Sequence, residues 1–135
     1  MIVRYLGGRQ FEIEHRGHRV LTDQPHDRGG EDQALTPTEL FVGSLAACTA
    51  LYAASVAHRH GLQRGDLTVE AQWHTDEGEN RVEGISLVLA FARPVARDIM
   101  EAVRRAAEQC LVHRSIKTAP QITVEVLVRS GVPGQ

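Results

Sequence analysis

Uncharged residues occupy every position from Leu40 to Ala57. On a helix they would cover all faces instead of one stripe, so other parts of the protein must surround such a helix. Thr36, Pro37 and Glu39 mark its start as the N-cap, the first helical residue and the closing member of a capping box. Gly61 is a suitable stop. The pattern predicts one long, buried central helix.

A run of this length also reaches the length of a membrane span. Its composition argues against that interpretation, because Ala, Ser, Thr and Gly make up over half of the residues from Leu40 to Ala57. A span needs stronger apolar character. We therefore expect a core helix that packs closely against other backbone, and no membrane partner.

Short alternating segments lie on both sides of this helix. Three precede it and predict a meander of antiparallel strands: Val3–Leu6, Gln10–His15 and His18–Thr22. The polar segment from Asp23 to Leu35 contains Pro25 and a glycine pair, which predicts a surface loop. After the helix, residues 67–75 and 81–91 alternate on either side of DEGEN and predict a hairpin.

The last third of the chain contains a second helical pattern. Pro94 opens it, apolar residues recur at helical spacing through Ile99 and Val103, and it ends near Cys110. A short CLVHRSIKTAP segment follows, and alternation from Ile122 to Val128 predicts a last strand.

This order of elements indicates an α+β fold built as a single domain over residues 1–135. We expect one sheet of about six antiparallel strands to cover one side of the central helix, and the second helix to cover part of another side. Some apolar surface of the central helix is then left over. A homodimer with both central helices in a shared core would cover it.

Composition and charge narrow the function classes. A net charge of −2 and an isoelectric point near 6.4 give no electrostatic reason to expect a nucleic-acid partner. The opening residues, MIVRYLGGRQ, lack the apolar core of a secretory signal, so we expect a cytoplasmic protein. Structural disulfides are rare in such a compartment, so the two cysteines are either buried thiols or reactive groups.

Each cysteine therefore has a structural and a chemical interpretation. Cys48 lies among small residues in AACTA, where inert packing is common. It lies about 11 residues, or ~16 Å, past the helix start, so the helix dipole helps its thiolate little. A reactive Cys48 would need a nearby cation. Cys110 has the same structural alternative, and the end of a helix disfavours its thiolate while His113, Arg114 and Lys117 favour it.

The pair Cys110-x-x-His113 also has a spacing that suits zinc. A closed zinc site needs four ligands, and the remaining candidates are Cys48 and scattered histidines such as His26, His58 and His60. The last two lie ~15 Å along the helix from Cys48. We expect no metal or other cofactor.

The run GGEDQALTPTELFVGSLAACTA, followed some sixty residues later by EQCLVHRSI, resembles the OsmC/Ohr family of osmotically induced and organic-hydroperoxide-resistance proteins. The resemblance spans nearly the whole chain and is closer to the OsmC-like branch. It implies an OsmC-like fold, an intertwined homodimer, and a thiol peroxidase that reduces organic hydroperoxides or hydrogen peroxide without metal or haem.

The resemblance also implies roles for particular residues. Cys48 matches the peroxidatic cysteine and Cys110 the resolving cysteine, so a Cys48 sulfenic acid would give a Cys48–Cys110 disulfide that an external, lipoyl-type dithiol reopens. The residue after the second cysteine is often proline in the family and is Leu111 here.

The family also uses an arginine, held by a carboxylate, to activate the first cysteine. Arg9 is the match, with Arg28 as the alternative, and either arginine can also be read as a solvated surface residue. Glu39 is the carboxylate. It lies nine residues before Cys48, which places it on the opposite face of an ideal helix, so it reaches the site only through an arginine or from another subunit. Alternatively, Glu39 only caps the helix.

A non-enzymatic function competes with this interpretation. The same fold can serve as a small-ligand binding or stress-related protein in which both cysteines merely pack. Thiol reactivity separates the two classes, because a buried inert Cys48 resists alkylation in the folded protein and a peroxidatic one does not.

Overall fold

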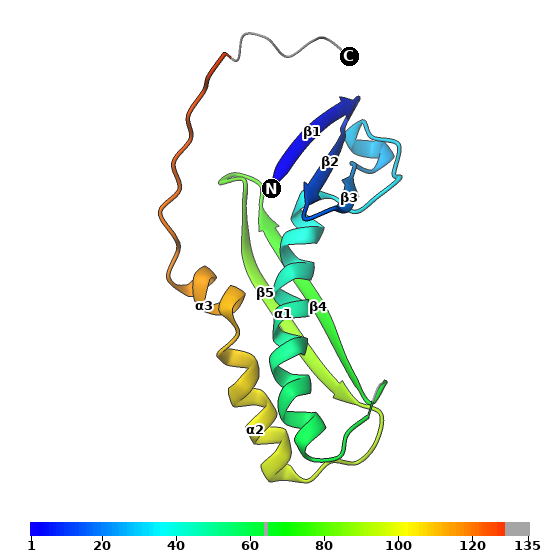
Figure 1. Ribbon diagram of the computed structural model, residues 1–135, viewed down its shortest axis with the longest axis vertical. Helices are drawn as coiled ribbons and strands as arrows, with labels where there is room; N and C mark the ends of the chain where they lie inside the picture. Colours follow the sequence, from blue (N-terminus) through cyan, green and yellow to red (C-terminus); the bar gives the residue numbers. More distant parts are fainter. Residues whose placement is uncertain (64, 129–135) are drawn as a thin grey trace.

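The computed structural model describes residues 1–63 and 65–128. Figure 1 shows the helices and strands of the chain. In order they are β1 (Ile2–Gly7), β2 (Gln10–His15), β3 (His18–Thr22), the 3-10 helix η1 (His26–Arg28), α1 (Pro37–Arg59), β4 (Leu67–Asp76), β5 (Arg81–Phe91), α2 (Arg97–Glu108) and α3 (Leu111–Lys117). The fold is mixed α+β, with antiparallel strands and one long helix.

The predicted ends of the central helix α1 are confirmed. The Thr36 hydroxyl accepts a hydrogen bond from the Glu39 amide at 3.1 Å, and the Glu39 carboxylate accepts one from the Thr36 amide at 2.7 Å. Together they satisfy two amides that the first turn leaves unpaired. At the other end Gly61 adopts a left-handed conformation with φ of 79°, which stops the helix.

The three N-terminal strands and the later hairpin are also confirmed. Strand β2 pairs antiparallel with both β1 and β3, and β4 pairs antiparallel with β5 along its whole length. Alternate positions of β5, including Ile85, Leu87 and Leu89, are partly buried and face the helices, as their spacing predicts.

The prediction of one six-stranded sheet is wrong for the single chain. Within the described residues, β1, β2 and β3 form one sheet, and β4 and β5 form another. The predicted last strand is also absent, because residues 119–128 pair with no strand and the side chains of Ile122, Val124, Val126 and Val128 are 80–94% exposed. Alternation alone does not make a strand, because the segment must also form hydrogen bonds with a neighbouring strand.

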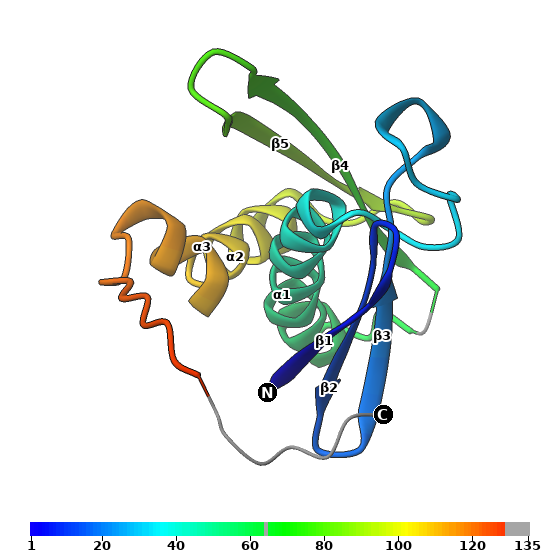
Figure 2. The same cartoon turned by 90° about the horizontal axis from the view of Figure 1, so that it is seen from above.

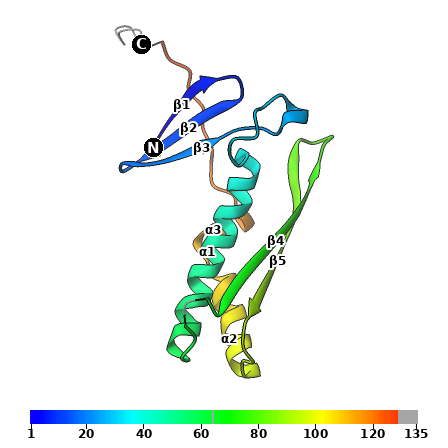
Figure 3. The ribbon, with the colours of Figure 1, turned by 90° about the vertical axis from the view of Figure 1, so that its right-hand side faces the viewer.

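In the single chain, helix α1 is covered on one side, and part of its apolar surface is left over, as the sequence predicts. Its buried residues face α2, α3 and the β4–β5 hairpin, where Ala53, Val56 and Ala57 pack with Val103 of α2. The side chains of Leu51 and Tyr52 are 64% and 37% exposed. Figures 1 and 3 show the β1–β2–β3 sheet near the N-terminal end of α1 instead of along its length, and Figure 2 shows the hairpin flanking the helices. One face of α1 is thus left open.

Helix α1 is also long and apolar enough to cross a membrane, but the core helix of a soluble protein can have the same length and composition.

The start of the second helix differs from its prediction. Helix α2 begins at Arg97 after an extended Ala96, not at Pro94, and it ends at Glu108. The short segment that follows, for which no element was predicted, contains a further helix, α3, which starts directly after Cys110. Cys110 is extended, with φ of −61° and ψ of 144°, so it separates two helices and serves as the N-cap of the second.

Candidate functional site

The two cysteines have different surroundings. Cys48 lies near the middle of α1 and is partly exposed, whereas Cys110 lies between α2 and α3 and is completely buried. Both are free thiols. An external reagent therefore has access to Cys48 and none to Cys110 in the single chain.

Two groups surround the sulfur of Cys110. The backbone amide of His113 donates a hydrogen bond to Cys110 Sγ at 3.2 Å, and the hydroxyl of Thr49 lies 3.7 Å from the same atom. Thr49 is buried in α1 and directly follows Cys48. The structure thereby brings the segment that carries the second cysteine against the turn of α1 that carries the first.

The electrostatic expectation for Cys110 takes account of only one of its two neighbouring helices. The residue follows the end of α2, where carbonyl groups disfavour a thiolate, as expected. It also lies at the start of α3, where its sulfur accepts a backbone hydrogen bond. Cysteine is not among the usual capping residues, so the sequence offered no sign of this role. Thr49 was missed because its partner is 61 residues away.

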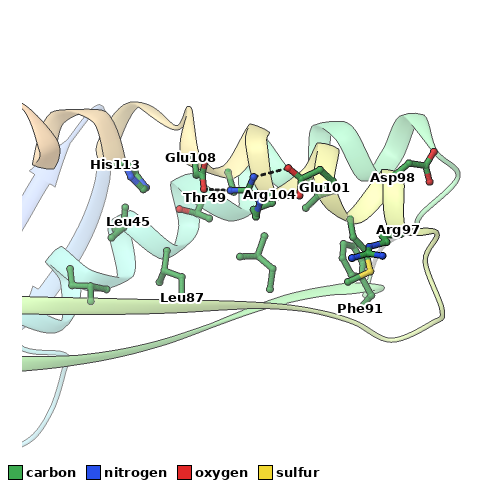
Figure 4. Close-up of a pocket in the computed structure, with 15 residues that line it drawn as sticks. Leu45, Thr49, Leu87, Phe91, Arg97, Asp98, Glu101, Arg104, Glu108 and His113 are labelled. Atoms are coloured by element: carbon green, nitrogen blue, oxygen red, sulfur yellow. Dashed lines mark hydrogen bonds and ion pairs between the residues drawn. The ribbon is translucent and has the colours of Figure 1, made fainter.

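An apolar groove of about 1000 Å³ runs between β5, α1 and α2. Leu87 and Phe91 of β5 lie on its floor, and charged residues of α2 form its rim (Figure 4). Arg104 on this rim forms ion pairs with Glu101 and Glu108, each with a nitrogen–oxygen distance of 2.6 Å. The hydrogen bond from Arg104 lowers the pKa of Glu101.

Both partners of Cys110 line this groove. Thr49 and His113 lie toward the same end of it, beside Leu45 (Figure 4). The groove therefore connects an apolar surface with the surroundings of the buried sulfur. An arrangement of this kind suits a small ligand with an apolar part.

The carboxylate of Glu39 caps the start of α1. Its carboxylate accepts the hydrogen bond from the Thr36 amide, and among the described residues no hydrogen bond or ion pair joins it to an arginine or to Cys48. The capping role is therefore present in the structure. A contact between Glu39 and the cysteine site is not formed within this chain.

The two candidate arginines lie in or beside the loop that leads into α1. Arg9 is in the turn between β1 and β2. Its Nε lies beside Gly29, 3.7 Å from the position that a Cβ atom on this glycine would occupy. Arg28 lines a smaller pocket of about 640 Å³ between the first turns of α1 and the tip of the β4–β5 hairpin. In the described part of the chain, neither arginine forms a hydrogen bond or ion pair with Cys48.

A buried carboxylate organises the loop that carries Arg28. Asp23 is fully buried and accepts hydrogen bonds from the Gln10 side chain and from the amides of Gln24, Glu31 and Gln33. Burial alone would raise the pKa of Asp23, but these hydrogen bonds outweigh it and hold the pKa below its usual value. The sequence gives no sign of this role, since an aspartate in a polar loop usually faces water.

The Cys110-x-x-His113 spacing has a structural explanation. The sulfur of Cys110 accepts from the backbone of His113, as an N-cap does, and the spacing follows from that turn. Over residues 1–63 and 65–128 no group of three or more His, Cys, Asp or Glu side chains is placed to hold a metal ion.

Comparison with known proteins identifies relatives of this architecture. A family model described as "OsmC-like protein" matches residues 30–125. A protein from Psychrobacter arcticus 273-4, named for osmotic stress induction and a detoxification response, is 23% identical with a TM-score of 0.77, covering 84% of this chain and 85% of that chain. No curated protein matches the sequence.

Two further solved structures are named for hydroperoxide resistance. The organic hydroperoxide resistance protein OsmC from Legionella pneumophila is 24% identical with a TM-score of 0.56, covering 86% of this chain and 88% of that chain. A protein from Vibrio cholerae, with captopril bound in one of its active sites, is 21% identical with a TM-score of 0.56, covering 87% and 83%. At these identities the likeness shows a shared fold.

Proposed function

Because the chain belongs to the OsmC-like family, we propose that it is a thiol-dependent peroxidase that reduces organic hydroperoxides or hydrogen peroxide through Cys48 and Cys110. One observation carries the proposal. Cys110 Sγ lies 3.7 Å from the hydroxyl of Thr49, the residue after Cys48, so the two cysteine-bearing segments are already in contact. The hydroperoxide-resistance names of the Legionella and Vibrio proteins support the same class of substrate.

The proposed reaction has two steps on the protein. The Cys48 thiolate attacks the terminal oxygen of the hydroperoxide, the O–O bond breaks, and an alcohol (or water, from hydrogen peroxide) leaves as Cys48 becomes a sulfenic acid. The Cys110 thiolate then attacks the sulfur of Cys48, the S–O bond breaks, and water leaves after protonation. The product is a Cys48–Cys110 disulfide, and an external lipoyl-type dithiol reduces it.

The cation for Cys48 belongs to the same proposal. Arg9, held by Glu39, would stabilise the thiolate, with Arg28 as the alternative. In the single chain Arg28 lies beside the first turns of α1, and Arg9 lies beside Gly29 of the preceding loop. The first residue of α1 is ~16 Å along the helix from Cys48. We therefore place the activating arginine on the other subunit of a homodimer.

An intertwined homodimer also accounts for the uncovered surface. Apolar side chains are exposed in three places: at Leu51 and Tyr52 on α1, at Ile2 and Tyr5 on β1, and along the unpaired segment 121–128. A soluble protein covers surface of this extent with another subunit. We therefore propose that the protein is a cytoplasmic homodimer, in which each subunit is a single OsmC-like domain spanning residues 1–135.

A second function, non-enzymatic binding of a small ligand, is favoured by the groove of about 1000 Å³. An assay of cumene hydroperoxide consumption with dihydrolipoamide as reductant separates the two. The peroxidase proposal predicts turnover that Cys48→Ser abolishes. Absence of turnover, together with a folded-state Cys48 that resists alkylation at neutral pH, would favour the binding protein instead.

A further inference from the structure

The two sulfur atoms of the proposed disulfide differ in access and in hydrogen bonding. Cys110 is completely buried, and its Sγ contacts the His113 amide at 3.2 Å and the Thr49 hydroxyl at 3.7 Å. Cys48 is partly exposed, and no hydrogen bond to its sulfur is found among the described residues. These differences bear on how the disulfide is reopened.

A thiolate that reduces a disulfide must choose one of two sulfurs. It attacks the sulfur that it can reach, and the other sulfur leaves faster when its thiolate is better stabilised. Both criteria select the same direction here. The proposed function already requires a path by which a hydroperoxide reaches the sulfur of Cys48, whereas Cys110 is completely buried. The sulfur that has hydrogen-bond donors beside it is that of Cys110.

Thr49 contributes to this asymmetry, and its hydrogen bond to Cys110 depends on whether Cys110 is a thiol or a thiolate. Either atom of the Thr49–Cys110 pair can donate while Cys110 is a thiol, but a thiolate can only accept. The hydroxyl of Thr49 must then donate to the leaving sulfur. Its burial in α1 keeps water from competing for that sulfur.

We propose that the dithiol reductant attacks Cys48 Sγ, that Cys110 is the leaving thiolate, and that Thr49 is the positioning residue that stabilises it. This inference rests on the proposed function. The S–S bond between Cys48 and Cys110 breaks, its electron pair passes to Cys110 Sγ, and a mixed disulfide forms between Cys48 and the reductant. The second thiol of the reductant then attacks its own sulfur in that mixed disulfide. Cys48 leaves as a thiolate, the reductant closes to a cyclic disulfide, and each protein thiolate takes up one of the two protons that the dithiol has lost.

The wild-type protein provides the direct test. One sample is oxidised to the disulfide with cumene hydroperoxide and a parallel sample with diamide, which oxidises thiols without the peroxidase reaction. Both are treated briefly with 2-mercaptoethanol, quenched with acid, alkylated with N-ethylmaleimide and mapped without reduction. We expect mercaptoethanol on Cys48 and maleimide on Cys110. Mercaptoethanol on Cys110, or equally on both cysteines, would overturn the inference.

The two oxidants separate this inference from the proposed function. If only diamide forms the disulfide and the adduct is on Cys48, the direction of attack stands and the peroxidase proposal falls. If neither oxidant joins the cysteines, both proposals fall.

Thr49→Val and Thr49→Ser test the positioning residue. Valine keeps the shape of threonine without its hydroxyl, so the reopening rate should fall about threefold to tenfold, the range expected for one hydrogen bond. Serine keeps the hydroxyl and should restore the rate. A Thr49→Val protein that reopens as fast as wild type, or a serine variant as slow as the valine variant, would remove Thr49 from the mechanism. The mapping experiment uses only wild-type protein, so it stands even where a variant folds poorly.

Discussion

The hydroxyl oxygen of Thr49 lies 3.7 Å from the sulfur of Cys110, a residue 61 positions further along the chain. This contact joins the middle of α1 to the junction between α2 and α3. It also places the second cysteine beside the turn that carries the first. The proposed chemistry depends on that proximity, whereas the proposed cation must come from elsewhere.

Mixed dimers test the origin of the cation. Arg9→Ala should slow peroxide consumption at neutral pH and recover partly at higher pH, because the arginine stabilises the Cys48 thiolate. If Arg9 acts across the interface, co-refolding Arg9→Ala with Cys48→Ser should restore about a quarter of wild-type activity, since half of the dimers then contain one complete site. No recovery above the two parent proteins would place Arg9 in its own subunit. Loss of activity in Arg28→Ala but not in Arg9→Ala would transfer the role to Arg28.

Glu39 has a capping role in the structure and a proposed role in the site, and Thr36 separates them. Thr36→Ala removes the other half of the same capping box and should lower the free energy of unfolding by about 1 kcal/mol with little change in peroxidase rate. Glu39→Gln keeps the shape of the side chain and removes its charge. It should reduce the peroxidase rate well beyond the effect of Thr36→Ala. Equal rates in the two variants would leave Glu39 as a helix cap alone.

The open face of α1 predicts an obligate dimer. Light scattering on a size-exclusion column should give the mass of two chains, and Leu51→Glu should produce monomers or aggregates because it places a charge in the shared core. Thr68→Glu on the exposed face of β4 is the matched control and should remain dimeric. A wild-type chain that stays folded as a monomer on dilution would contradict the shared core.

Asp23 predicts a pH dependence of stability. Its pKa in the folded protein lies below the usual value near 3.8, so its carboxylate stabilises the folded state fully above that value. The contribution should disappear as the pH falls through the folded pKa, below 3.8. In Asp23→Asn the thermal midpoint should be lower at neutral pH, and its difference from wild type should narrow in acid. A difference that is independent of pH would mean that the charge of Asp23 is not what orders the loop.

Local signals explain what could be predicted from the sequence. Thr36, Pro37 and Glu39 mark the start of α1 because capping depends only on neighbouring residues. The β4–β5 hairpin follows from alternation on both sides of one turn. For the same reason the three N-terminal strands are found where their pattern places them.

The remaining features depend on contacts that sequence patterns do not encode. Ile122 to Val128 alternate as a strand does, but in the single chain they pair with neither sheet. Cys110 caps α3 with a sulfur atom, which capping preferences do not anticipate. The contact between Thr49 and Cys110, like the hydrogen bond from Gln10 to Asp23, exists only once separate segments have packed.

The most direct test of the account is the fate of the two thiols after one equivalent of cumene hydroperoxide. Intact mass and peptide mapping without reduction should show that both free thiols disappear and a Cys48–Cys110 bond forms. Cys110→Ser should stop at a sulfenic acid on Cys48 and reach the sulfinic form with excess peroxide, while Cys48→Ser should leave Cys110 reduced. If Cys110 oxidises first, or if both thiols survive excess peroxide in the folded protein, the protein is not a peroxidase of this kind and its cysteines only pack.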